Sequence, residues 1–333
     1  MLEQLSNLDG ISGREDSVRS YLLECLKEAP LETSVDTMGN LLVRKGKTVQ
    51  KPLMISAHMD EVGLMITSID KKGMLNFNPV GGIDSRVLPG TRVRFGDACK
   101  PGVIGVKPIH LQKAEEQEKP FDPETLYIDG GFSSEAEACR HAKVGDYAAF
   151  DIDCISFGAD CYRGKAFDDR AGCLILLKLL LEDNGLNFSA AFTVQEEVGT
   201  RGAIIAANHL KPRFALVVET TAAADTPDNE NKQAGTVLGD GPAISIMDRT
   251  LMVSRRMREG LVALAEKRAL PYHYRRFTGA GTEGGAIALS GEGVQTAVVS
   301  VPCRYIHSPN SVISRRDIDN TMSLVRAWLE KHQ

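Results

Sequence analysis

The sequence predicts an α/β fold in which helices cover both faces of a sheet, with a small β-rich domain inserted into it. After Gly164, runs typical of strands and helices alternate along the chain, and such alternation favours a sheet covered by helices on both faces. Residues 65–153 consist instead of short strand-like runs separated by glycine-rich turns, which is typical of a small β domain. We therefore predict one α/β domain formed by residues 1–64 and 154–333, interrupted by residues 65–153.

Three elements are predicted before the insertion. Ser12 and Glu15 have the spacing of a capping box at the start of a helix, and apolar side chains follow at helical intervals. A hairpin is predicted around residues 38–40, and the apolar run 52–57 predicts a buried strand. The chain thus enters the insertion directly after a buried strand.

The insertion and the segment after it contain the remaining elements. One short helix is predicted near Ser134. Apolar runs predict strands at 188–194, 214–218 and 296–301, and helices are predicted at 169–181, 201–210, 250–269 and 315–331. The polar segment 223–233 contains proline and predicts a loop.

Composition excludes several classes of protein. The chain has 333 residues, 43% of them hydrophobic, and a net charge of -5. No basic run is longer than two residues, which argues against a nucleic-acid partner. Seven cysteines without a C-x-x-C pair indicate neither a disulfide framework nor a thiolate zinc cluster. No stretch approaches the roughly 18 apolar residues of a membrane span, and the N-terminus lacks a signal-peptide pattern. We therefore expect a cytoplasmic protein without a membrane partner.

Histidines and carboxylates follow the predicted strands. Taken singly, each has an ordinary structural explanation, such as a helix cap for Asp169 or a hydrogen-bonded structural role for His58. Together they favour a binding site over separate structural roles, because most of them follow strands, and the carboxyl ends of strands in an open α/β sheet form the edge where ligands bind. The residues at these strand ends are His58, Asp60, Glu196, Glu197, Glu219 and His307, and Asp168 directly precedes a predicted helix.

This set of side chains suits a pair of divalent metal ions. Zinc, cobalt and manganese accept imidazole nitrogen and carboxylate oxygen, and two ions about 3.5–4 Å apart require a carboxylate that bridges them. One histidine and one carboxylate for each ion, with a bridging aspartate, give the five ligands His58, Asp168, Glu197, Glu219 and His307. We therefore expect two divalent metal ions per subunit, with zinc, cobalt and manganese as the candidates.

Glu196 and Asp60 remain outside the ligand set. In the H-x-D pattern, Asp60 is placed to accept the second N–H of the His58 ring and so to orient it. Neighbouring side chains at a strand end point in different directions, so Glu197 can bind metal while Glu196 faces a water between the ions. The sequence therefore predicts Glu196 as a general base.

Five motifs in order, SAHMDEVG, GKAFDDRAGC, VQEEVGTRGA, VVET...DTP and SVPCRYIHSP, resemble those of the tetrahedral aminopeptidases. These are dinuclear metallopeptidases of the glutamyl or deblocking type, often labelled endoglucanases, and the likeness covers nearly the whole chain. The resemblance implies a zinc-peptidase-like α/β/α sandwich with an inserted PDZ-like dimerisation domain. It also implies a homo-oligomer in which dimers build a hollow dodecamer, and removal of N-terminal residues from short peptides with a free N-terminus.

The resemblance also assigns roles to individual residues. It implies that His58 and His307 are terminal ligands, that Asp168 bridges, and that Glu197 and Glu219 complete the two sites. Glu196 would be the base and Asp60 would orient His58, and the peptide bond between Asp168 and Asp169 would be cis.

The sequence departs from the family pattern at three places. Glu219 stands where the family usually has aspartate, Ala222–Ala224 replace a His-Ala-Gly approach, and Glu283 stands where aspartate is common. We expect these changes to affect substrate preference and metal identity more than the class of reaction.

Three alternatives to an aminopeptidase stay open. A related deacylase or carboxypeptidase would share the ligands but prefer N-acylated or C-terminal substrates. A glycoside hydrolase would use two carboxylates at a sugar cleft without metal. A non-catalytic assembly protein would carry a weakened metal site at Glu219, although the intact pair of Glu196 and Glu197 argues against it.

Overall fold

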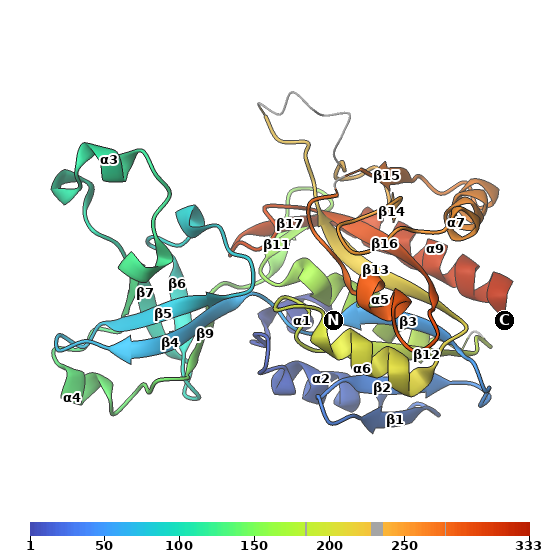
Figure 1. The fold of residues 1–333 in the computed structure, drawn as a ribbon, viewed down its shortest axis with the longest axis horizontal. Coiled ribbons are helices and arrows are strands. Elements are labelled where there is room, and N and C mark those ends of the chain that lie inside the picture. Colours follow the sequence, from blue (N-terminus) through green and yellow to red (C-terminus); the bar gives the residue numbers. More distant parts are fainter. Residues whose placement is uncertain (184, 228–235, 277) are drawn as a thin grey trace.

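A large mixed sheet forms the body of the molecule (Figure 1). The computed structural model describes residues 1–183, 185–227, 236–276 and 278–333. Within these residues the main strand order is β1-β2-β12-β3-β13-β16-β17-β11-β10, and β14 pairs with β15 and β16. The bounds are β1 Glu32–Val35, β2 Leu41–Lys45, β3 Leu53–His58, β10 Ile155–Phe157, β11 Cys161–Gly164, β12 Phe188–Thr193, β13 Phe214–Ala222, β14 Ala243–Ser245, β15 His273–Arg275, β16 Gln295–Arg304 and β17 Ser311–Ser314.

The four central strands β12, β3, β13 and β16 are parallel. Their carboxyl ends therefore lie on the same edge of the sheet. The strands are buried on both faces, as in β3 and β12, where every residue is buried, which is the usual state of a parallel sheet with helices on both sides. The prediction of an α/β fold is confirmed at this level.

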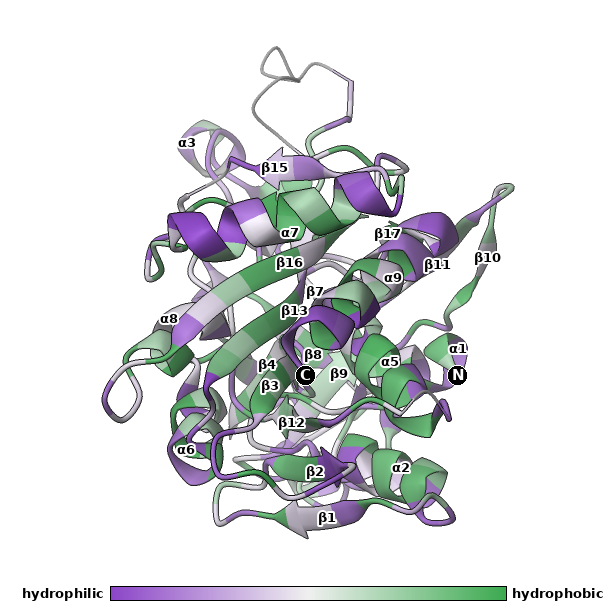
Figure 2. Cartoon of the chain, turned by 90° about the vertical axis from the view of Figure 1, so that its right-hand side faces the viewer, coloured by the Kyte–Doolittle hydropathy of each residue, from purple (hydrophilic) through white to green (hydrophobic). Residues whose placement is uncertain are grey.

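Helices pack against both faces of this sheet (Figure 2). On one face, α5 contacts β3 and β13 and also packs against α1, α2 and α9; on the other, α6 and α8 contact each other and strands β12, β13 and β16. α7 packs against α9, β14 and β16. The bounds are α1 Leu2–Asn7, α2 Asp16–Leu26, α5 Phe167–Leu181, α6 Arg201–Leu210, α7 Arg255–Lys267, α8 Glu283–Ala288 and α9 Arg315–His332.

α5 is buried along nearly its whole length because apolar side chains occupy all of its sides. This central helix begins two residues before the range 169–181 that the sequence predicts, and its first turn carries the two adjacent aspartates at positions 168 and 169. The fold therefore places these carboxylates near the edge where the parallel strands end. No helix among the described residues has the length and apolar character needed to cross a membrane.

A second body, set apart from the sheet in Figure 1, is a closed barrel with strand order β4-β5-β8-β7-β6-β9. Its own apolar core includes Leu64, Phe77, Phe95 and Ile128. Its strands are β4 Gly63–Ile69, β5 Leu75–Val80, β6 Arg92–Phe95, β7 Lys100–Gly105, β8 Tyr127–Asp129 and β9 Tyr147–Phe150, and its short helices are η1 Ser85–Val87, η2 Ile109–Leu111, α3 Ala114–Gln117, η3 Pro123–Thr125 and α4 Glu135–Ala138. The short helix predicted near Ser134 is confirmed as α4, with Ser134 as its N-cap.

Two of the predicted elements are wrong in detail. The helix predicted over 250–269 begins only at Arg255, because the Asp248 carboxylate accepts hydrogen bonds from the N–H groups of Thr250 and Leu251 and forms a turn there. The predicted capping box is also wrong, since α2 begins at Asp16 and the side chain of its N-cap residue Glu15 makes no hydrogen bond that caps the helix. The hydroxyl of Ser12 instead donates to Asp60, 2.6 Å away.

The remaining elements agree with the prediction or extend it. The hairpin around residues 38–40 joins β1 and β2, and the predicted strands at 214–218 and 296–301 continue further in β13 and β16. Of the polar loop 223–233, residues 228–233 lie outside the described residues.

Candidate metal centre

The ends of the parallel strands bring the predicted side chains together. His58 is the last residue of β3, Glu219 lies in β13, Glu197 follows β12, and His307 follows β16. Asp168 comes from the first turn of α5, where its backbone is not helical. The peptide bond between Asp168 and Asp169 is cis, which confirms that prediction.

These five side chains form two donor groups that share Asp168. In the first, the Nε2 atom of His58 lies 3.2 Å from Oδ1 of Asp168 and 3.3 Å from Oε1 of Glu219. In the second, Nε2 of His307 lies 3.0 Å from Oδ2 of Asp168 and 3.2 Å from Oε1 of Glu197. The donor atoms of each group lie within 4.8 Å of one another. The two oxygens of Asp168 thus face one group each, as a bridging carboxylate would.

Backbone carbonyl groups orient both imidazole rings. Nδ1 of His58 lies 3.0 Å from the carbonyl oxygen of Asp60, and Nδ1 of His307 lies 2.7 Å from the carbonyl oxygen of Gly82. When Nδ1 carries the proton and donates it to the carbonyl, Nε2 has its lone pair free to bind metal. Gly82 follows β5, so the barrel contributes to the orientation of His307. Sequence reasoning missed this contact because a backbone carbonyl leaves no side-chain signal.

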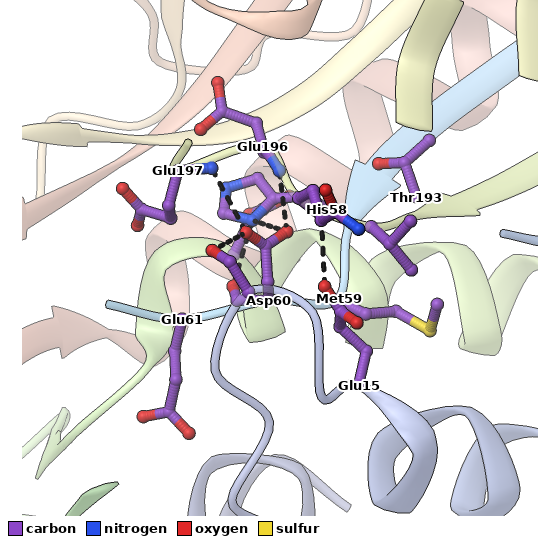
Figure 3. Close-up of polar contacts among 12 residues, drawn as sticks. Glu15, His58, Met59, Asp60, Glu61, Thr193, Glu196 and Glu197 are labelled. Atoms are coloured by element: carbon purple, nitrogen blue, oxygen red, sulfur yellow. Dashed lines mark hydrogen bonds and ion pairs between the residues drawn. The ribbon is translucent and has the colours of Figure 1, made fainter. Parts of the chain in front are cut away.

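The Asp60 carboxylate fixes the backbone of the two glutamates (Figure 3). It accepts hydrogen bonds from the N–H of Glu196 at 2.9 Å and of Glu197 at 3.1 Å. The Ser12 hydroxyl donates to the same carboxylate. Because the carboxylate lies 3.5 Å from Nδ1 of His58, the closer acceptor for that ring is the Asp60 carbonyl.

The charges in the centre raise and lower pKa values strongly. Burial lowers the pKa of His307, but the Asp168 and Glu197 carboxylates outweigh burial and raise this pKa to about 11. Burial, together with the negative charge of Asp168, raises the pKa of Glu219 to about 8 although His58 opposes this. Burial opposes ionisation of Asp168, yet its hydrogen bonds to His307 and His58 hold its pKa well below the usual range.

The donor set fits two divalent cations. Buried Glu219 and half-buried Asp168 and Glu197 bring three carboxylates together around two imidazoles, and such a concentration of negative charge is unfavourable unless cations are bound or protons are taken up. Imidazole and carboxylate donors are those that zinc, cobalt and manganese accept. The donor set therefore suits zinc, cobalt and manganese alike.

Comparison with known proteins identifies the family. The sequence pattern of the family described as M42 glutamyl aminopeptidase matches residues 39–324. This chain belongs to the M42 family. The resemblance stated from the five motifs is thereby confirmed.

Relatives and solved structures agree with this assignment. The lysyl aminopeptidase of Pyrococcus furiosus is 30% identical, with 99% of this chain and 96% of that protein covered. An aminopeptidase from Desulfurococcus kamchatkensis is 37% identical, with 99% and 93% of the two chains covered and a TM-score of 0.93. The TET1 peptidase of Pyrococcus horikoshii, which can assemble into a tetrahedron or a large octahedral shell, is 32% identical over 98% of both chains with a TM-score of 0.87. The M42 chain is accordingly a metal-dependent aminopeptidase.

Glu196 of this M42 peptidase lies beside the donor groups without belonging to them. Figure 3 shows its side chain leaving the backbone in a different direction from that of Glu197. Burial and the negative charges of Glu219, Glu197 and Asp168 raise its pKa well above the ordinary value, although His58 opposes them. A carboxylate with a raised pKa is better able to take up a proton near neutral pH.

Two further carboxylates of the M42 peptidase are buried close to the centre. Asp169 accepts hydrogen bonds from the N–H of Gly172 at 3.0 Å and from the hydroxyl of Thr220 at 3.3 Å, which agrees with a structural role. Glu283 accepts hydrogen bonds from the hydroxyls of Ser56, at 2.6 Å, and Thr193. Sequence reasoning named Glu283 only as a departure from the family and missed its contacts with β3 and β12.

Proposed function

We propose that this peptidase removes single residues from the N-terminus of short peptides with a free amine, with Glu196 as general base. The observation that carries the proposal is the pair of donor groups that share Asp168, with Glu196 next to Glu197 in the chain and near enough to the donors for their charges to shift its pKa. In this proposal His58, Asp168 and Glu219 hold one ion, and Asp168, Glu197 and His307 hold the other. Zinc, cobalt and manganese all suit these donors.

The residues of the chain then have distinct roles. Bound at these donors, two divalent ions would supply Lewis acidity that polarises a carbonyl group and makes a water molecule more acidic. Glu196 takes a proton from the attacking water and later delivers it to the leaving amine. Asp60 holds the backbone of Glu196 and Glu197 in place through its two accepted N–H bonds.

The same proposal covers domain organisation and assembly. Residues 1–64 and 154–333 form the catalytic domain, and residues 65–153 form a PDZ-like dimerisation domain. Two observations support the division: the barrel has its own apolar core, and its strands β4 to β9 form one continuous segment of the chain between β3 and β10 of the large sheet (Figure 1). Dimers of this chain build a dodecamer, by analogy with two solved structures of TET1 peptidase, one with a dodecamer in the asymmetric unit and one described as able to form a tetrahedron or a large octahedral shell.

A panel of aminoacyl anilides tests the activity. We expect free-amine substrates to be cleaved, cleavage to stop after chelation, and zinc, cobalt or manganese to restore it, because every proposed step needs the occupied centre. N-acetylated anilides of the same residues are the matched control and should remain intact. Preferential cleavage of the acetylated substrates would contradict the proposal and favour a deacylase.

Glu219→Gln tests the donor that departs from the family pattern. Glutamine keeps the length of the side chain but replaces the charged carboxylate, whose Oε1 lies 3.3 Å from Nε2 of His58, by a neutral amide. Loss of a hydrogen-bond partner of a metal ligand already costs about tenfold to hundredfold in affinity, so we expect binding of one ion to weaken by at least this much and little change for the other. Calorimetric titration of the metal-free chain measures both. Unchanged affinity for both ions would show that Glu219 is not a ligand.

A further inference from the structure

Three residues of the quoted motifs have no place in the mechanism. Glu61, Lys165 and Arg170 form a buried ionic cluster, with 2%, 0% and 0% of each residue exposed. Glu61 directly follows Asp60, and Lys165 precedes Asp168 by three residues. The cluster therefore joins the two segments that carry His58 and the shared carboxylate.

Lys165 makes a full set of contacts. Its Nζ atom lies 2.6 Å from Oε1 of Glu61, 3.0 Å from Oδ1 of Asp9 and 3.2 Å from the carbonyl oxygen of Leu8. These three acceptors match the three N–H groups of an ammonium. Lys165 thus holds the segment after β3, the segment after α1 and its own segment at fixed distances.

Glu61 and Arg170 add further bonds to the same segments. Oε1 of Glu61 also accepts the N–H of Gly10 at 3.1 Å and lies 3.5 Å from Nη2 of Arg170. Nε of Arg170 donates to the carbonyl oxygen of Met59 at 2.8 Å, directly between His58 and Asp60. In Figure 3, Glu61 points away from His58, so it is placed to act on the centre only through the backbone.

The barrel is tied into this cluster through Asp9. Nη2 of Arg94, in β6, lies 2.7 Å from Oδ1 of Asp9, and its Nε lies 3.2 Å from Oδ2. Asp9 is therefore held between a barrel arginine and Lys165. The chain of charges from Arg94 through Asp9 and Lys165 to Glu61 ends beside the metal donors.

We propose that Lys165 and Glu61 are positioning residues that set the separation of His58 from Asp168, and thereby the affinity for divalent cations. A buried ion pair contributes little net stability compared with apolar residues of the same volume. A gain in stability therefore does not by itself explain why an ion pair, and not apolar side chains, joins these two segments. The inference rests on the ligand set of the proposed function.

Lys165→Met distinguishes positioning from simple electrostatics. Removing a positive charge near a cation site would, through space, make divalent cations bind more tightly. Loss of positioning has the opposite sign, because the donors of the first group are no longer held together. We expect about tenfold to hundredfold weaker binding.

The full chain is stripped of metal and titrated with Co²⁺, with calorimetry for affinity and visible absorption for the ligand field. Lys45→Met is the matched control: Lys45 is also buried, and its Nζ lies 2.9 Å from the carbonyl oxygens of Leu179 and Leu180 at the far end of α5. We expect this control to lower the melting temperature and leave Co²⁺ affinity unchanged.

The double variant Glu61→Gln with Lys165→Met provides a second test if Lys165→Met alone does not fold. It removes one negative and one positive charge of the same ion pair, so the net charge of the chain does not change. Electrostatics alone then predicts unchanged Co²⁺ affinity, whereas loss of positioning predicts weaker binding. Equal or tighter binding in whichever variant folds, judged by circular dichroism, overturns the inference. Wild-type chain that binds no Co²⁺ would instead overturn the ligand set itself, and with it both proposals.

Discussion

Replacing Glu196 by alanine is expected to leave both ions bound and to lower kcat by about 100-fold to 10,000-fold. The size follows from the usual contribution of a positioned general base. Metal binding should persist because Glu196 belongs to neither donor group, and Asp60 bonds its backbone N–H, which alanine retains. Metal content per chain and initial rates on a free-amine anilide measure the two effects together.

A surface glutamate provides the control for this variant. Glu259 is exposed on α7 and pairs with Arg255 one turn away, so Glu259→Ala should keep both metal and turnover. Glu196→Gln removes the base with little change of shape and should match the alanine variant. Normal turnover in either Glu196 variant with metal bound would show that another group accepts the proton.

Most of the fold could be predicted from the apolar runs of the sequence and from the polar residues that follow them. The apolar runs locate the central strands, and parallel pairing then requires their carboxyl ends to share one edge. The lengths of β13 and β16 were underestimated because polar residues such as Glu219 and Thr220 resemble a strand end, whereas the pairing continues from Phe214 with Gln295 to Ala222 with Cys303. α7 begins late because the Asp248 turn overrides the helical spacing of apolar residues.

The donors of the centre could be predicted, but much of what orients them could not. His58, Asp168 and His307 carry chemistry that the sequence displays. Gly82 acts through its carbonyl oxygen from the barrel, and no residue type signals such a contact. The spacing of Ser12 and Glu15 predicts a local helix cap, but the Ser12 hydroxyl instead donates to Asp60, 48 positions further along the chain. Contacts of this kind depend on tertiary packing, which local spacing does not encode.

Asp168→Asn is expected to abolish tight binding of both ions. Its two carboxylate oxygens face different histidines, at 3.2 and 3.0 Å, and asparagine keeps the shape but supplies one neutral oxygen and an amide that cannot bind metal. Activity should fall to background. Because a ligand that binds only the folded state stabilises it by about 2.7 kcal/mol at 100 times its Kd, added zinc should raise the melting temperature of the wild type and not of this variant.

His58→Ala and His307→Ala test whether each histidine binds one ion while Asp168 binds both. Each removes a donor from one group only, so each should weaken one ion and retain the other, whereas Asp168→Asn should weaken both. Metal content after dialysis, read against the wild type, distinguishes these patterns. If Asp168→Asn lost only one ion, the carboxylate would belong to a single group, and the second ion would need a ligand other than the five that converge here; the buried Asp169, adjacent in the chain, would then be the first to replace.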